Sequence, residues 1–443
     1  MNPSKLILYS LLALALVRGL IYGAVVPPWQ APDEPAQFER VKASLSAADW
    51  NSNSQNGPAW YDELSKSLFT FRYWDFVDAS RPSYVPNSIG RYIALYQEIY
   101  QGLYGSRGAY VVMAWPLFLA PHQDITPQLY LVRVNMVLMN VAVIFLAYLI
   151  VRTIFPGDTF LVLGTPLIIL FNPQHTHLMS TVNNGNLAEL LATTVLYFMV
   201  AGIMQGFSLL KIFAMLSLSL VAMWTKATAY FLPLAIGSLM LFYLPAYRRH
   251  WRWLLLSGAI LAALVYFFIP QRLILLLASF GALASSGNFF YLDPLVPIDL
   301  FRSFWAYPGW MILQLHPFWY QLLFLSCLLA LIGLLGLLAK GRLGYAPSRR
   351  LQFRVLLVLA IAVASSIVTI LAWNAVTQSI VYRQGRSIYP VIVPISLFLM
   401  LGWRQLIPAG WRRFSLLALT VGLSLFDSLV LFGYIIPFFY SNY

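Results

Sequence analysis

Apolar stretches recur along this 443-residue chain at about the length of a membrane-crossing helix. Roughly 20 apolar residues in a helix cross a hydrocarbon core of about 30 Å. The chain lacks the runs of about ten residues with alternating polarity that are typical of strands in a membrane barrel. Because no water reaches the bilayer core, each spanning helix must satisfy its own backbone hydrogen bonds. The pattern therefore predicts an all-α, polytopic membrane protein.

The stretches predict about eleven transmembrane helices within one transmembrane domain, 1–443. The expected spans are 6–26, 128–151, 159–171, 186–204, 209–224, 227–244, 253–269, a helix ending near Lys340, 353–373, 388–405 and 414–437. The piece 109–120 is left out, because it is only about 12 residues long and contains Pro116. An interfacial helix is expected there.

Composition and charge support this class. Hydrophobic residues make up 60% of the chain and charged residues 10%, with a mean hydropathy of +0.73, which excludes an ordinary soluble domain. The net charge of +13 would suit nucleic acid, but the basic clusters lie between apolar helices. They are typical of positive-inside topology markers and contacts to membrane lipids, so no nucleic-acid partner is expected. The clusters are Arg248, Arg249 and Arg252; Lys340, Arg342, Arg349, Arg350 and Arg354; and Arg404, Arg412 and Arg413.

With the basic clusters inside, two long loops face the outside, 27–127 and 270–309. The first carries ten of the 15 acidic residues and much aromatic sequence, which predicts a cap with interfacial helices rather than a linker. These ten are Asp33, Glu34, Glu39, Asp49, Asp62, Glu63, Asp75, Asp78, Glu98 and Asp124.

Asp33 and Glu34 lie between two prolines, just after the first apolar stretch. Prolines restrict the neighbouring backbone and would fix the direction of both side chains. One carboxylate could then act as a base while the other tunes it or binds a cation. The alternative is a helix N-terminus, because acids in the first turn are favoured by the helix dipole. Both interpretations can hold together.

Arg383 and Arg386 lie in the run Tyr382-Arg383-Gln384-Gly385-Arg386-Ser387, at the predicted outer mouth of a helix. Guanidinium groups form forked, charge-assisted hydrogen bonds to phosphate. The alternative is a pair of snorkelling cations, although these two face the side opposite the basic clusters.

Three further segments fall on the same predicted face. His175 and His177 could bind a phosphate or a metal, or could be hydrogen-bonded structural groups. The polar run 180–186, with Asn183 and Asn184, implies a cavity, because irregular backbone near membrane depth requires one. Lys226 could meet an anion or simply occupy a turn. The aromatics around Trp305 could stack on a sugar or anchor at the interface. Arg18, Glu189 and Asp427 lie in or near apolar helices, where a charge usually has a partner or a function.

The order of these motifs resembles a family of largely uncharacterised bacterial membrane proteins within the GT-C glycosyltransferase superfamily. The similar segments are Pro32-Asp33-Glu34-Pro35-Ala36-Gln37-Phe38, Asn172-Pro173-Gln174, Val182-Asn183-Asn184, Ser303-Phe304-Trp305, Gly309-Trp310-Met311 and Gln384-Gly385-Arg386. The resemblance implies a multispanning fold with a catalytic first external loop, and a polyprenyl-phosphate-linked sugar as donor. It also implies that Asp33 is the catalytic carboxylate with Glu34 beside it, and that Arg386 binds the donor phosphate.

The chain departs from the family pattern at three places. Gln37 stands where a His is common, an Asp is missing at Asn184-Gly185-Asn186, and Ser387 replaces an aromatic residue. The metal ligands are therefore left unknown, with Asp33 or Glu34 expected to bind the ion if Mg or Mn is a cofactor. Gln37, Asn183, Asn184 and Trp305 are expected to line the cavity. Arg383, Lys226 and His175 are expected to assist Arg386 with the phosphate.

The function predicted from these residues is transfer of a sugar from a polyprenyl-phosphate-linked donor to a glycan, lipid or protein acceptor. The site would lie on the external face of a bacterial inner (plasma) membrane. Two alternatives stay open: a transporter or flippase for a lipid-linked saccharide, and a non-catalytic binding homologue.

Overall fold

The computed structural model describes residues 3–47, 60–77, 107–120, 124–243, 295–339, 347–377 and 384–441, with a few single positions between them. Within these ranges every element is a helix, which confirms the all-α, multi-pass membrane fold. Seven helical segments in the described residues are long and apolar enough to cross a membrane. Shorter apolar helices cover 107–119, 159–170, 209–225 and 227–239.

The seven long apolar segments and the shorter helices α9, α12 and α13 follow the predicted spans closely. They are α1 (Pro3–Val25), α8 (Ile125–Ile154), α9 (Thr159–Leu170), α11 (Asn184–Gln205), α12 (Leu209–Thr225), α13 (Leu232–Tyr243), α18 (Pro317–Ala339), α19 (Pro347–Thr377), η6 with α20 (Gly385–Val391 and Ile392–Leu406), and α21 (Arg412–Val430), continued by η8 (Leu431–Ile435) and α22 (Ile436–Tyr440). The predicted span 253–269 lies outside the described residues, so the count of eleven stays a prediction.

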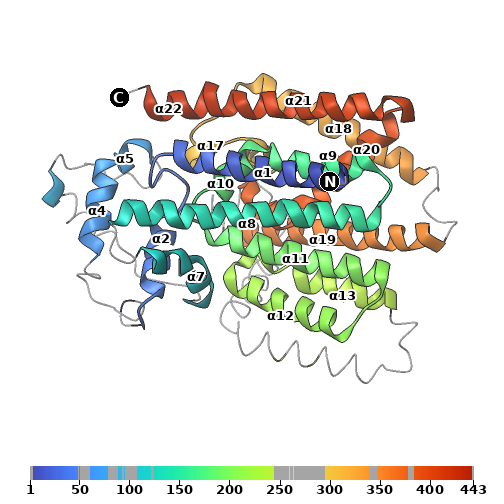
Figure 1. Cartoon of the computed structure of the whole chain (residues 1–443), viewed down its shortest axis with the longest axis horizontal. Helices are drawn as coiled ribbons and strands as arrows, with labels where there is room; N and C mark the ends of the chain where they lie inside the picture. Colours follow the sequence, from blue (N-terminus) through green and yellow to red (C-terminus); the bar gives the residue numbers. More distant parts are fainter. Residues whose placement is uncertain are drawn as a thin grey trace.

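The helices pack side by side in one bundle (Figure 1). In this bundle α11 lies against α8 and α12, and α20 lies against α18 and α9. The α18–α20 contact depends on small residues: a Cβ on Gly333 would collide with the Gly402 carbonyl oxygen. Close backbone approach at small residues is a common way for helices to associate in membranes.

Arg18 and Asp427 join α1 to α21 inside the bundle. Arg18 Nε donates to Asp427 Oδ2 at 2.8 Å, and Tyr22 donates to Asp427 Oδ1 at 2.7 Å. Arg18 Nη1 also donates to Thr176 Oγ1 at 2.9 Å, in α10 (Pro173–Met179). Both charged side chains are only 8% exposed. Two charges that are costly alone in a membrane therefore neutralise each other.

Short helices form a cap at one end of the bundle, on the left of Figure 1. They are α2 (Glu34–Ser44), α4 (Tyr61–Thr70), α5 (Tyr73–Phe76), α7 (Arg107–Ala114) and η1 (Trp115–Leu119). Trp29 and Phe38 pack edge to face in its core, and Trp29 Nε1 donates to Ser67 Oγ at 2.9 Å. The cap is thus a packed helical unit, as expected for the first polar segment. Its location on the membrane surface stays a prediction.

The opposite end of the bundle carries basic residues. Asp158 pairs with Arg404, and Gln352 Nε2 donates to the Ile154 carbonyl at 2.8 Å, so the adjoining ends of α8, α9, α19 and α20 lie together. Arg152 ends α8, and Arg412 begins α21. The described members of the other two basic clusters, such as Arg354, Arg404 and Arg412, therefore lie away from the D-E-P motif. The predicted cluster of Arg248, Arg249 and Arg252 lies outside the described residues. Which end faces the cytoplasm stays a prediction.

Candidate functional site

Asp33 immediately precedes α2 and adopts a left-handed backbone conformation, with φ of 65°. This conformation is uncommon for a residue with a side chain, so the surrounding structure must hold it in place. Asp33 occupies the N-cap position, yet its side chain caps no backbone N–H. Instead, Asp33 Oδ2 accepts a hydrogen bond of 2.7 Å from Arg386 Nη2. The helix start expected at this motif is confirmed, because α2 begins directly after Asp33. The catalytic role of Asp33 stays a prediction.

Glu34 points in a different direction, into the protein. Its Oε1 accepts from Arg133 Nε at 2.9 Å and from Val182 N at 3.0 Å. Its Oε2 accepts from Arg133 Nη2 at 2.6 Å and from Trp29 N at 3.0 Å. Four donors occupy the positions that an ionised carboxylate offers, and the side chain is 0% exposed. Glu34 therefore positions the motif, and Asp33 is the acid that faces outward.

Arg386 follows Gly385, whose backbone lies directly on α16 (Leu295–Trp305). A Cβ at Gly385 would collide with the backbone nitrogen of Phe304, so a larger residue would push η6 away. Gly385 N also donates to Ser303 Oγ at 2.7 Å. The glycine of the Q-G-R motif thus permits the close contact that directs Arg386 toward Asp33. Arg383 lies outside the described residues.

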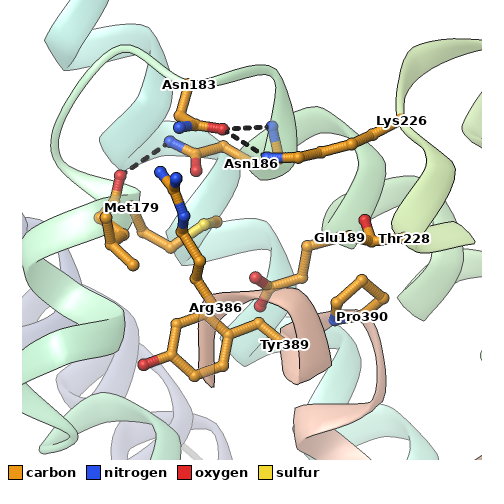
Figure 2. Close-up of a pocket in the computed structure, with 11 residues that line it drawn as sticks. Met179, Asn183, Asn186, Glu189, Lys226, Thr228, Arg386, Tyr389 and Pro390 are labelled. Atoms are coloured by element: carbon orange, nitrogen blue, oxygen red, sulfur yellow. Dashed lines mark hydrogen bonds between the residues drawn. The ribbon is translucent and has the colours of Figure 1, made fainter. Parts of the chain in front are cut away.

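A narrow cleft lies around the Arg386 side chain (Figure 2). Arg386 and Lys226 extend into it from different elements, and Asn183 and Glu189 lie beside them. Lys226 Nζ donates to Asn183 Oδ1 at 2.9 Å. In the part of the chain that the structure describes, Arg386 Nη1 and Asn183 Nδ2 are buried without a hydrogen-bond partner. Buried donors are normally satisfied, so these two indicate a place for an acceptor ligand. The cleft is lined by Leu178, Met179, Asn183, Gly185, Asn186, Glu189, Lys226, Thr228, Arg386, Tyr389 and Pro390.

The charged groups at the site shift the pKa values of their neighbours. Burial, together with the Arg386 charge, lowers the pKa of Lys226 to about 7, and Asp33 acts against both. Burial raises the pKa of Asp33, but the Arg386 and Lys226 charges outweigh it, so this pKa lies below its usual range. Asp33 is therefore ionised at neutral pH. The Lys226 ammonium group loses its proton at a pH close to neutrality.

The other predicted site residues lie around this cleft. His175 is fully buried behind it, and its Nε2 lies 2.7 Å from Glu189 Oε1. Gln37 and Asn184 lie in a network next to the cleft, where Gln37 Oε1 accepts from Tyr110 at 2.9 Å and from Asn184 N at 3.3 Å. Trp305 lines a separate groove. The structure therefore brings Asp33, Lys226, Asn183 and Arg386 together, and places His175, Gln37, Asn184 and Trp305 around them.

That groove lies on the other side of η6, between α16, α18, α19 and α20. All of its lining side chains are apolar except that of Cys327. Ile388 lines it two positions after Arg386, so one short segment borders both the charged cleft and the apolar groove. The groove is lined by Leu300, Phe301, Phe304, Trp305, Cys327, Ala330, Leu331, Leu334, Val363, Ile367, Ile388, Ile395, Phe398 and Leu399.

In the part of the chain that the structure describes, the site offers few free ligands for a divalent cation. No group of three or more His, Cys, Asp or Glu side chains lies together in the described residues. Asp33 already faces Arg386, and Glu34 faces Arg133. A protein site for Mg²⁺ needs free oxygen ligands, usually carboxylates together with the substrate phosphates. No step is therefore assigned to a metal.

Two residues important to the site were not assigned to it from the sequence. Arg133 lies inside the apolar helix α8, and its presence there was a signal that it needs a buried partner. Glu189 was recognised as a charge in an apolar helix, but its partner His175 could not be deduced. The sequence could not place Glu189 in the cleft, because that requires the packing of α10 against α11 and η6.

The fold and the cleft define a polytopic, all-α membrane protein with a charged site at the end of the bundle opposite its basic clusters. No family model matches the chain, and no curated protein matches it significantly. Its fold is similar to the crystal structure of ArnT from Cupriavidus metallidurans bound to undecaprenyl phosphate, with 15% identity and a TM-score of 0.46. That match covers 99% of this chain and 74% of ArnT. The apo state of ArnT gives 15% identity and a TM-score of 0.39, covering 90% of this chain and 71% of ArnT. At this level of identity, the chemistry of the site has to be inferred from the residues of this chain.

Proposed function

We propose that the protein is a GT-C-type membrane glycosyltransferase that moves a sugar from a polyprenyl-phosphate-linked donor to an acceptor hydroxyl at the external face. The observation that carries the proposal is the continuity of three features around η6. Two cations, Arg386 and Lys226, line one cleft, and the partly exposed Asp33 carboxylate pairs with Arg386. Ile388, two positions after Arg386, lines the apolar groove. A lipid phosphate has the matching parts: an anion for the cleft and a long apolar chain for the groove.

Arg386 and Lys226 are the proposed ligands of the donor phosphate. Arg386 offers Nη1, which is buried and unpartnered in the described residues, and Lys226 lies across the cleft from it. Charge-assisted bonds from these groups stabilise the negative charge that develops on the leaving phosphate. His175 does not line the cleft itself, and lies behind Glu189 and Tyr389, which do. The phosphate role expected for His175 is therefore not part of this mechanism.

Asp33 is the proposed base. The acceptor O–H proton passes to Asp33, the acceptor oxygen bonds to the anomeric carbon, and the bond from that carbon to the phosphate oxygen breaks. The bonding electrons leave with the polyprenyl phosphate. Its Arg386 partner weakens Asp33 as a base in the donor-free protein, and a phosphate that competes for Arg386 releases the carboxylate.

The direct test is transfer by purified protein. A polyprenyl phosphate carrying a radiolabelled sugar is incubated with the protein in liposomes, with candidate glycan, lipid and protein acceptors present. Labelled product should form together with an equal amount of free polyprenyl phosphate. Movement of the labelled lipid across the bilayer without release of free lipid phosphate would instead identify a flippase and refute the proposal.

Arg386→Gln should weaken binding of undecaprenyl phosphate by about 10- to 100-fold, because a charged hydrogen-bond donor to an anion is lost. Binding can be measured by lipid competition or native mass spectrometry. Arg72→Gln is the matched control, since Arg72 pairs with Asp75 on the exposed surface of the cap. Equal affinity of the Arg386 variant and the control would contradict the phosphate assignment.

Lys226 predicts a pH dependence of anion binding. Its pKa of about 7 means that the ammonium form, which favours an anion, declines as the pH rises through neutrality. Affinity for undecaprenyl methyl phosphate, a diester of constant charge over this range, should therefore fall between about pH 6 and pH 8. Lys226→Met should bind more weakly at pH 6 and lose the pH-dependent step. A variant that keeps the step would show that another group titrates.

A further inference from the structure

Glu189 places a carboxylate in the same cleft as the two cations. It lies on α11 about one turn beyond Asn186 and is 2% exposed. His175 Nε2 lies 2.7 Å from Glu189 Oε1, and the His175 ring packs edge to face on Tyr389 at 5.1 Å. These contacts fix the Glu189 carboxylate at the wall of the cleft, where Figure 2 shows it between Arg386 and Thr228.

In the described residues the Glu189 carboxylate forms no ion pair with Arg386 or Lys226. Among the described residues, its only ion-pair partner is His175, whereas Arg386 pairs with Asp33 and Lys226 binds Asn183. A buried site tolerates such an acid only where nearby charges offset it. An incoming ligand therefore meets two cations, Arg386 and Lys226, and two acids, of which Asp33 pairs with Arg386 and Glu189 with His175.

The donor and the lipid product of the proposed reaction differ in charge. A sugar-linked lipid phosphate is a phosphodiester with one negative charge. The released lipid phosphate is a monoester, which carries a second charge above about pH 6. Two cations alone would hold the doubly charged product more tightly than the donor. A site of that kind would be inhibited by its own product.

We propose that Glu189 is a specificity-determining residue that makes the phosphate site favour the singly charged diester over the doubly charged monoester. This inference rests on the proposed function, and it specifies that the phosphate site distinguishes the sugar-linked donor from the released lipid phosphate. The fixed carboxylate repels each unit of phosphate charge, so it destabilises the monoester by one unit more than the diester. Glu189 thereby aids release of the lipid phosphate after transfer.

Several other groups face this carboxylate. They are His175 from α10, Arg386 and Tyr389 from η6, Lys226 at the end of α12, and Asp33 through its contact with Arg386. Lys226 also titrates near neutrality and weakens the binding of both lipids as the pH rises. Because the Lys226 charge also acts more strongly on the monoester than on the diester, the two affinities are compared between the variant and the wild type at the same pH.

The test compares Glu189→Gln with the wild type, using undecaprenyl phosphate and undecaprenyl methyl phosphate as probes. The amide side chain of this variant would keep an oxygen for His175 and remove only the charge. At pH 8 the substitution should raise the ratio of monoester affinity to diester affinity by about tenfold. This is the order of effect expected when one unit charge is removed at the effective dielectric constant of a protein. At pH 5.5, where both probes carry about one charge, the difference should disappear. Undecaprenyl phosphate should also become a stronger inhibitor of transfer.

Asp75→Asn is the control, because it removes one carboxylate from the exposed cap pair with Arg72. It should leave the ratio of monoester to diester affinity unchanged. Weaker binding of both probes by Glu189→Gln, or an unchanged ratio at pH 8, would overturn the inference. The wild type gives a check that needs no variant: at pH 8 it should bind the monoester no more tightly than the diester. A tenfold preference for the monoester would refute the inference.

The inference and the proposed function fail in different ways. If Arg386→Gln weakens both probes while Glu189→Gln leaves their ratio unchanged, only the role of Glu189 is wrong. If Arg386→Gln affects neither probe, the phosphate site itself is misplaced, and both proposals fall together.

Discussion

Asp33→Asn should reduce sugar transfer by about 100- to 10,000-fold, the range that a positioned general base contributes. The amide cannot take the acceptor proton, yet it can still accept a hydrogen bond from Arg386, so the cleft should keep its shape. Binding of undecaprenyl phosphate should be retained or become tighter, because the competing carboxylate charge is lost. The measurement is the initial rate of label transfer alongside lipid binding.

The matched control for this experiment is Asp75→Asn, which changes an acid at the same end of the molecule. Asp75 pairs with Arg72 at 2.6 Å, and both side chains are more than a third exposed. Its removal should leave transfer near the wild-type rate. Full transfer activity in the Asp33 variant would show that the base lies elsewhere, even if the phosphate site is correct.

Glu34→Gln should destabilise the protein strongly, by about 3–5 kcal/mol, because one partner of a buried ion pair is removed. Arg133 would keep its contacts with the Gly23, Val26 and Pro27 carbonyls but lose its counter-charge. The loss should appear as a lower apparent Tm in detergent, measured by fluorescence-detected size-exclusion chromatography after heating.

The control removes one acidic charge from the exposed pair of Asp75 with Arg72. Asp75→Asn should change the free energy of unfolding by no more than about 1 kcal/mol. An unchanged Tm for Glu34→Gln would mean that the Arg133 contacts do not hold the cap to α8. Retained stability together with lost transfer would return Glu34 to a catalytic role.

The helical spans could be predicted because membrane helices are set by length and hydropathy, which are local properties of the sequence. The structure follows the prediction even at α9, which is short and contains Pro166. The segment formed by α7 and η1 is likewise a short, broken helix where no full span was expected. Its interfacial position stays a prediction. Neither result required knowledge of distant contacts.

The candidate site could be predicted only in part, for the same physical reason. Asp33 and Arg386 are separated by 353 positions, and only their shared side of the membrane could be deduced. The different roles of Asp33 and Glu34 depend on Arg133, a residue on another helix. Adjacent acids look alike in a sequence, and the packing of α8 against the start of α2 decides which of them is buried.

The Arg18–Asp427 pair has a consequence for how the chain is assembled. Asp427 lies 409 positions after Arg18, so during synthesis α1 reaches the membrane long before its counter-charge exists. Until α21 arrives, Arg18 must stay solvated by lipid headgroups, water or a chaperone, at a cost of several kcal/mol. Docking of α21 is therefore the step that offsets the Arg18 charge inside the bundle, and it comes only after Asp427 has been synthesised.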